Sequence, residues 1–148
     1  MTIINKYLLT TFLRITSLAL GIFVGIYLLV DFFEKVDDFL EHSAPISLYF
    51  TFFGYKLPLI ISQVLPLTIL MGVFLTLGGL SKSNELTAMR AGGISLLRLL
   101  VPIILATTLL SIIHFALNEY IVPAGVRNAD YILRTQVKGK PAAITKHD

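Results

Sequence analysis

The chain has 148 residues, of which 55% are hydrophobic and only 14% are charged. A soluble domain carries roughly 25% charged residues. Because the shortfall is concentrated in long uncharged runs, the composition excludes a soluble globular protein and predicts an integral membrane protein. The absence of cysteine excludes disulfides and thiolate metal sites, and the net charge of +3 reflects flanks and tail, not a nucleic-acid-binding stripe.

The first apolar run lies between Arg14 and Asp31. Because Arg14 can snorkel and Asp31 can sit at the interface, the run reaches the roughly 20 residues of a membrane span, and we predict this span at about residues 12–33. A cleaved signal peptide is the alternative, which the length of the run and the lack of a small-x-small cleavage site disfavour. Gly21 and Gly25, four residues apart, predict a face that another helix approaches closely.

The loop of residues 31–56 begins with acidic residues and ends with aromatic ones. Pro45 suits the first turn of a helix. We therefore predict an approach helix at the membrane interface, with Tyr49 and Tyr55 as interfacial anchors. The charged residues of the loop are Asp31, Glu34, Asp37, Asp38 and Glu41, against Lys35 and Lys56.

Two further spans are predicted at about residues 57–80 and 97–119, where the chain is again long and apolar. His114 lies inside the third span, where an ionisable residue is a functional candidate. A neutral histidine that is hydrogen-bonded to a neighbouring helix is the plainer interpretation.

After Pro123 an amphipathic helix is predicted to continue the third span into water. The break Lys138-Gly139-Lys140-Pro141 should end it, and residues 123–148 are expected to form a periplasmic extension and the start of a truncated domain. The apolar face of this helix comprises Val126, Ala129, Leu133 and Val137.

Between the second and third spans, a polar segment predicts a short helix at about residues 83–92. Ser83 is expected to cap its N-terminus, Glu85 should complement the exposed N–H groups of its first turn, and Gly92-Gly93 should end it. Ser95 can then cap the third span. Because so short a helix is unstable alone in water, the membrane surface or the groove of a partner protein must hold it. A capped turn that merely joins two spans is the alternative.

No catalytic constellation is present. The segment Gly78-Gly79-Leu80-Ser81-Lys82-Ser83 lacks the Gly-Lys-Ser/Thr of a phosphate loop, and no His-Glu-x-x-His metal helix occurs. An intramembrane enzyme built on His114 and Glu119 has little support, since residues five apart share a helical face poorly. We therefore expect a non-enzymatic subunit, without cofactor or metal, that depends on a separate energy source.

Basic residues leave the orientation open. The whole-chain count places seven on the side of the acidic loop and tail and five on the side of the polar segment, whereas the two internal loops alone put the polar segment in the cytoplasm. Long translocated domains escape this rule, so both orientations stand at this point.

Several motifs occur in a fixed order along the chain. They are Leu65-Pro66-Leu67, Met71-Gly72, Leu77-Gly78, the run from Asn84 to Ser95, and Asn118-Glu119-Tyr120-Ile121-Val122-Pro123. Together they resemble the lipopolysaccharide-export permease family, LptF and LptG, over nearly the whole chain, and Leu29-Val30-Asp31 is closer to LptG than to LptF. The resemblance implies an all-α membrane fold of three spans. In the family these lead to a β-jellyroll domain and three more spans, so the chain is expected to be a fragment or a split or truncated gene product.

The resemblance also implies a mechanism. Two such permeases, with a dimeric, LptB-like cytoplasmic ATPase, extract lipopolysaccharide from the inner membrane and pass it to a periplasmic bridge. An LptC-like single-span protein is a further partner that the resemblance implies. The N-terminus would be cytoplasmic and the tail periplasmic. The ATPase-coupling residues implied are Ser83, Glu85, Leu86, Ala88, Met89, Arg90 and Gly92.

The first span would form part of a lateral gate for the lipid, with Gly21, Gly25, Asp31 and Lys35 as its residues. Family members carry several basic residues there, and only Lys35 matches, so a divalent-cation bridge or an altered gate is the alternative to direct phosphate binding. The alternative function is a small, non-transporting membrane scaffold that binds a partner through its helices.

Overall fold

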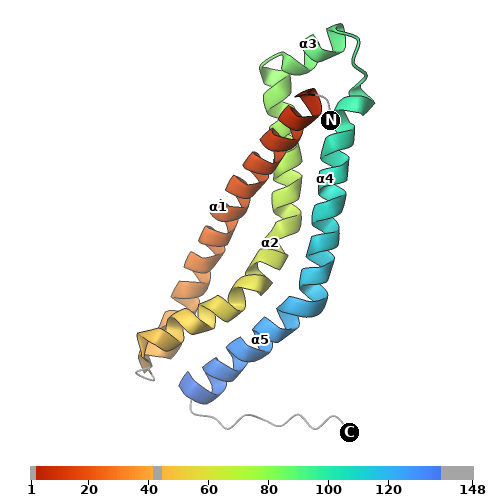
Figure 1. Cartoon of the computed structure of the whole chain (residues 1–148). Coiled ribbons are helices and arrows are strands. Elements are labelled where there is room, and N and C mark those ends of the chain that lie inside the picture. The colour runs from red at the N-terminus through yellow and green to blue at the C-terminus, as the bar shows by residue number, and fades with distance from the viewer. Residues whose placement is uncertain (1–2, 42–44, 138–148) are drawn as a thin grey trace. The chain divides into compact units, whose positions relative to one another are not determined.

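A computed structural model describes residues 3–41 and 45–137, and within those ranges every regular element is a helix (Figure 1). Because these ranges hold no strand, the predicted all-α class is confirmed. In chain order the elements are α1 (Ile3–Glu41), α2 (Ile46–Lys82), α3 (Glu85–Ala91), α4 (Leu96–Ala116), the π-helical η1 (Leu117–Ile121), α5 (Val122–Tyr131) and the π-helical η2 (Ile132–Val137).

Among the described residues, three helical stretches are long and apolar enough to cross a membrane. They are Ile3–Asp37, Ile46–Lys82 and Leu96–Gln136. The prediction of three spanning helices is thereby confirmed. Each helix extends beyond the apolar run that predicted it, because helical hydrogen bonds continue into the polar flanks.

The segment predicted as an approach helix is the first part of α2. This helix continues without interruption through Pro58 and Pro66, although each proline removes one backbone donor. No break therefore separates the aromatic approach segment from the second span.

The described residues form two compact units. The first, which we call the loop unit, comprises residues 3–23 and 63–115. The second, the tail unit, comprises residues 24–41, 45–62 and 116–137. Helices α1 and α2 each contribute to both units.

The loop unit is built on two apolar clusters that join α1, α2 and α4. One centres on the buried side chains of Phe12, Ile103 and Ala106. The other joins Leu8, Leu80 and Leu99, one from each helix. Burial of a large apolar side chain contributes roughly 1.5–3 kcal/mol in water. Between helices in lipid, however, the contribution comes mainly from close van der Waals packing.

Helices α1 and α2 approach each other closely where Gly72 faces Thr16. A Cβ atom added to Gly72 would lie 2.1 Å from the Thr16 Oγ1 atom. The buried hydroxyl of Thr16 has no hydrogen-bond partner within the described residues. The contact is therefore steric, and it depends on the missing side chain of Gly72.

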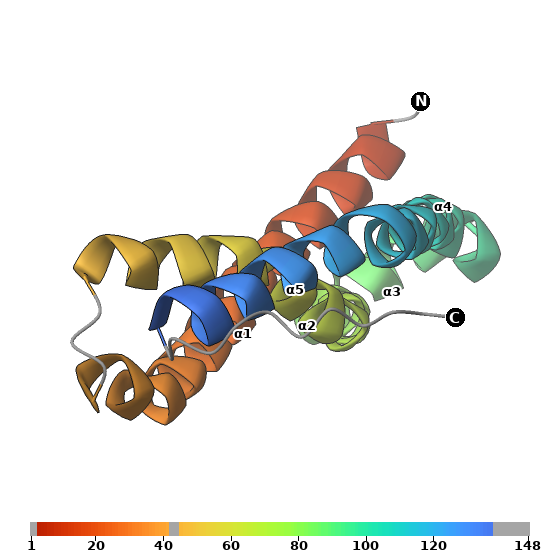
Figure 2. The ribbon, with the colours of Figure 1, turned by 90° about the horizontal axis from the view of Figure 1, so that it is seen from below.

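The tail unit is built on an aromatic cluster in which α5 runs alongside the first turns of α2 (Figure 2). Phe52 of α2 packs against Ala129 of α5 and Ile132 of η2. Gly125 lies close against α2, since a Cβ added there would lie 2.4 Å from the Tyr55 carbonyl oxygen.

The helical continuation of the third span is confirmed, because helix runs without interruption from α4 through η2. Of the predicted apolar face, Ala129 is buried, Leu133 packs against the aromatic cluster and Val126 is half-buried. Val122, Gly125 and Ile132 are buried as well. The side chain of Val137 and the predicted break at Lys138-Gly139-Lys140-Pro141 lie outside the described residues.

Candidate functional site

Helix α3 follows α2 after only two residues, Ser83 and Asn84 (Figure 1). The backbone N–H of Ser83 still bonds the Gly79 carbonyl of α2 at 3.0 Å. Asn84 has a left-handed backbone with φ of 58°, which asparagine tolerates better than most residues. Its carbonyl accepts the first hydrogen bond of α3, from the Ala88 N–H at 2.9 Å.

The prediction that Ser83 caps α3 is therefore wrong, because Asn84 occupies the N-cap and makes no side-chain cap bond. Ser83 closes the preceding helix instead. Its hydroxyl has three acceptors within reach: the Gly79 carbonyl at 3.1 Å, the Leu80 carbonyl at 3.4 Å and the Glu85 Oε1 atom at 2.9 Å.

The predicted end of α3 is confirmed. The Ile94 N–H bonds the Met89 carbonyl at 3.2 Å and the Gly93 N–H bonds the Arg90 carbonyl at 3.0 Å, which is the pattern of a Schellman motif. Gly93 has φ of 84°, a conformation that glycine adopts without strain. The cap at the start of α4 is also confirmed, since the Ser95 hydroxyl accepts the Arg98 N–H at 3.4 Å.

Helix α3 is held by its own chain. Leu86 and Met89 are half-buried and pack, together with Ile94, against the cluster of Leu8 and Leu80. That cluster joins the ends of α1, α2 and α4. The short helix is thus anchored on the spanning helices and presents its other face outward.

The outward face of α3 is small and polar, and no residue of the helix is fully buried. Two of the predicted coupling residues, Leu86 and Met89, lie on the opposite, inner face of α3, which packs against the spanning helices. Ala88, Arg90 and Gly92 are exposed. The exposed residues on and beside this face are Thr87, Ala88, Arg90, Ala91 and Gly92.

Both carboxylate oxygens of Glu85 accept hydrogen bonds. The Tyr7 hydroxyl of α1 donates to Oε2 at 2.8 Å, and the Ser83 hydroxyl donates to Oε1 at 2.9 Å. Sequence reasoning did not find Tyr7, because no local pattern links it to a residue 78 positions away. The carboxylate at the head of α3 is thus held in a defined orientation.

The residues predicted for a lipid gate lie elsewhere. In the tail unit, the Asp31 carboxylate forms an ion pair with the Lys56 ammonium group, not with the neighbouring Lys35. The side chains are only 7% and 17% exposed, and the second Asp31 oxygen has no partner within the described residues. Lys56 also lies 5.7 Å from the centre of the Phe52 ring, a distance that permits a cation–π contact.

The glycines of the predicted packing face remain open. No atom of the described residues lies within 4 Å of a Cβ built on Gly21, and the same holds for Gly25. The close approaches occur at Gly72 and Gly125 instead. A role for Gly21 and Gly25 in packing against another protein stays a prediction.

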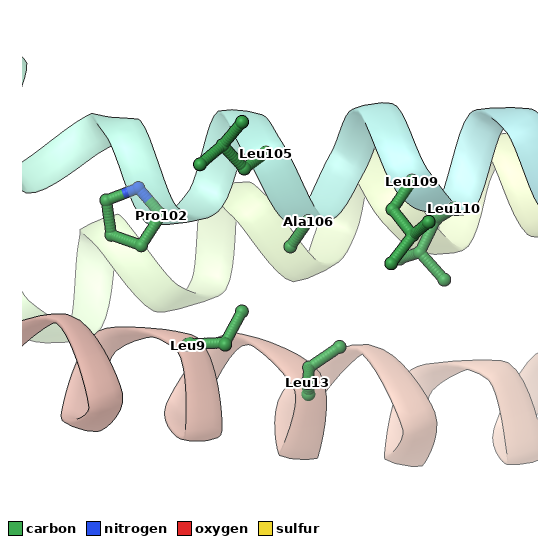
Figure 3. A pocket seen from close by; sticks show the side chains of 7 residues that line it. All are labelled: Leu9, Leu13, Pro102, Leu105, Ala106, Leu109 and Leu110. Atoms are coloured by element: carbon green, nitrogen blue, oxygen red, sulfur yellow. The ribbon is translucent and has the colours of Figure 1, made fainter. Parts of the chain in front are cut away.

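An apolar groove of about 250 Å³ opens between α1 and α4 within the loop unit (Figure 3). Leu9 and Leu13 of α1 face Ala106 and its neighbours on α4. Its lining is entirely aliphatic: Leu9, Leu13, Pro102, Leu105, Ala106, Leu109 and Leu110. Such a surface offers no polar group for chemistry. Within the part of the chain that the structure describes, no three His, Asp or Glu side chains come close enough to hold a metal ion.

Comparison with known protein families shows a match over almost the whole chain. The family model described as lipopolysaccharide export system permease LptF/LptG matches residues 6–148. A comparison with curated proteins gives no significant match. The family match spans α1 through η2 and therefore includes both the α3 site and the ion pair of the tail unit.

Proposed function

This chain belongs to the LptF/LptG family of lipopolysaccharide-export permeases, and on that premise we propose that α3 receives mechanical work from a separate cytoplasmic ATPase. The permease is a multi-pass protein of the inner membrane and acts as a transport subunit. The observation that carries the proposal is the anchoring of α3 on three spanning helices, with an oriented carboxylate at its head.

The anchoring makes α3 suited to transmit force. Leu86 and Met89 pack against a cluster to which α1, α2 and α4 each contribute a leucine. Because protein interiors are close-packed, a displacement of α3 must move those helix ends or break the contacts. A partner that pushes or pulls α3 therefore acts on all three spanning helices of the loop unit.

The outward face of α3 is suited to close contact. Ala88 and Gly92 present almost no side chain, so a groove in the ATPase can approach the helix backbone. Glu85 and Arg90 supply opposite charges near the two ends of the helix. Such charges fix the register of a docked helix more than they raise its affinity.

The need for an external motor follows from the cargo. Withdrawing lipid acyl chains from a bilayer exposes methylene groups at roughly 0.8 kcal/mol each. Several chains together demand far more than thermal energy, and the sequence contains no phosphate-binding loop. We therefore place ATP hydrolysis on a separate dimeric, LptB-like subunit.

We propose the membrane orientation and the other subunits of the complex on the same premise. The N-terminus and α3 face the cytoplasm, and the tail faces the periplasm. A second LptF/LptG-like permease and an LptC-like single-span protein complete the complex, and the lipid leaves through a periplasmic bridge. Asp31 and Lys35 lie toward the periplasmic end of α1, where the lipid headgroup would pass, and Gly21 and Gly25 would face the second permease.

The test is Glu85→Ala in the complete permease pair, reconstituted with the export ATPase in lipid nanodiscs. A lost charge-assisted hydrogen bond should weaken ATPase binding by about ten- to a hundredfold and stop lipopolysaccharide release, while membrane insertion is unchanged. Glu41→Ala, which removes an exposed carboxylate at the far end of α1, is the matched control and should have no effect. Normal ATPase binding and export by Glu85→Ala would refute the coupling role and favour a non-transporting scaffold.

A further inference from the structure

We propose that Tyr7 is a positioning residue for Glu85, so that the first helix sets the orientation of the carboxylate that the ATPase reads. This inference rests on the proposed function of α3. It is carried by the 2.8 Å hydrogen bond from the Tyr7 hydroxyl to Glu85 Oε2, which joins the second turn of α1 to the first residue of α3.

Tyr7 is itself held firmly. The next residue, Leu8, is only 1% exposed and forms the core cluster with Leu80 and Leu99. The backbone of Tyr7 is thereby fixed, while its side chain is 44% exposed and its hydroxyl reaches Glu85. A rigid aromatic ring on an anchored backbone places its hydroxyl more accurately than a flexible side chain could.

Ser83 cannot do this work alone. Its hydroxyl has a single proton, and the Gly79 and Leu80 carbonyls compete with Glu85 for it. The Tyr7 bond constrains the other carboxylate oxygen. Together the two donors fix both Glu85 oxygens, and loss of Tyr7 leaves the orientation to a shared serine proton.

The hydrogen bonds from Tyr7 and Ser83 leave acceptor sites on the Glu85 carboxylate for the partner. An ionised carboxylate offers about four lone-pair sites, of which Tyr7 and Ser83 occupy two. One site on each oxygen stays available, which is what a guanidinium group needs for a bidentate pair. The plane that Tyr7 imposes on the carboxylate sets the direction from which a donor group of the ATPase approaches.

The test is a double-mutant cycle in the complete permease pair with the export ATPase, with ATPase affinity as the readout. Tyr7→Phe keeps the ring and removes the hydroxyl, and should weaken ATPase binding about two- to tenfold. In the Glu85→Gln background, Tyr7→Phe should cause no further loss, because the carboxylate on which it acts is already gone. Tyr27→Phe on the same helix is the control and should leave the affinity unchanged.

The outcomes separate the two proposals. An unchanged affinity for Tyr7→Phe, or an equal loss in the presence and absence of the Glu85 carboxylate, would overturn the positioning role while leaving the coupling role of α3 intact. If Glu85→Gln itself binds the ATPase normally, the coupling role and the positioning role fail together. A loss for Tyr7→Phe that disappears in the Glu85→Gln background supports both.

Discussion

The carboxylate of Asp31 pairs with the ammonium group of Lys56, 25 residues along the chain, although Lys35 lies one helical turn away on α1. The pair ties α1 to α2 within the tail unit. The ammonium group of Lys56 is therefore occupied by an ion pair within the protein. Lys35, which is half-buried, remains the basic residue of the predicted lipid gate.

Breaking this pair should be costly. Lys56→Met leaves the Asp31 carboxylate buried without a partner, and we expect a loss of about 3–5 kcal/mol of stability. The double variant Asp31→Leu/Lys56→Met removes both charges and should recover most of that loss. Thermal unfolding in detergent measures the effect. Lys35→Met, the control, should change stability by about 0.5 kcal/mol or less, and an equal loss there would contradict the assigned pairing.

The contact between Gly72 and Thr16 makes a second prediction. Gly72→Ala places a methyl group 2.1 Å from the Thr16 Oγ1 atom, and should destabilise the loop unit by about 1–3 kcal/mol. Thr16→Ala in the same chain should relieve part of the clash. Gly78→Ala, also in α2, meets open space and should be neutral or slightly stabilising. Equal thermal stability of the Gly72 and Gly78 variants would disprove the close approach.

The end of α3 gives a third prediction. Gly93→Ala forces a side chain into a left-handed backbone and should cost about 1–2 kcal/mol. Gly92 has φ of −75°, so Gly92→Ala should be tolerated by the fold. Hydrogen exchange at the Ile94 amide, which closes the cap, would report the difference. Unchanged protection in Gly93→Ala would show that the cap does not limit the stability of α3.

Much of the fold is readable from the sequence because its signals are local. Long uncharged runs predict the spanning helices, and the caps at Gly93 and Ser95 depend on residues within one turn. Local sequence favours Ser83 as the N-cap of α3, because serine is a typical capping residue. Only the tight turn from α2 into α3 shows that Asn84 is the residue whose carbonyl begins the helix.

Contacts between residues far apart in the chain could not be predicted from the sequence, and the reason is physical. The Tyr7–Glu85 bond and the Asp31–Lys56 pair depend on how helices pack, which apolar periodicity does not specify. Gly125 of α5 is buried, but it carries no side chain and so gives no hydrophobic signal in the sequence. A Cβ atom added there would nevertheless lie 2.4 Å from the Tyr55 carbonyl oxygen of α2. A residue without a side chain can therefore mark a close helix contact that hydrophobic patterning does not indicate.

Arg90 makes a final prediction, about the chemistry of the docking surface. Its side chain is exposed in the last turn of α3, whereas Leu86 and Met89 are half-buried against the spanning helices. An exposed ion pair with the ATPase contributes modestly, so Arg90→Ala should weaken binding by about two- to fivefold at low salt. Because salt screens exposed charges, the difference from the unaltered chain should vanish at about 1 M salt. Arg98→Ala is the control, an exposed arginine in the first turn of α4. If Arg90→Ala lowers affinity equally at all salt concentrations, Arg90 acts through the fold of α3 and not as a charge at the interface.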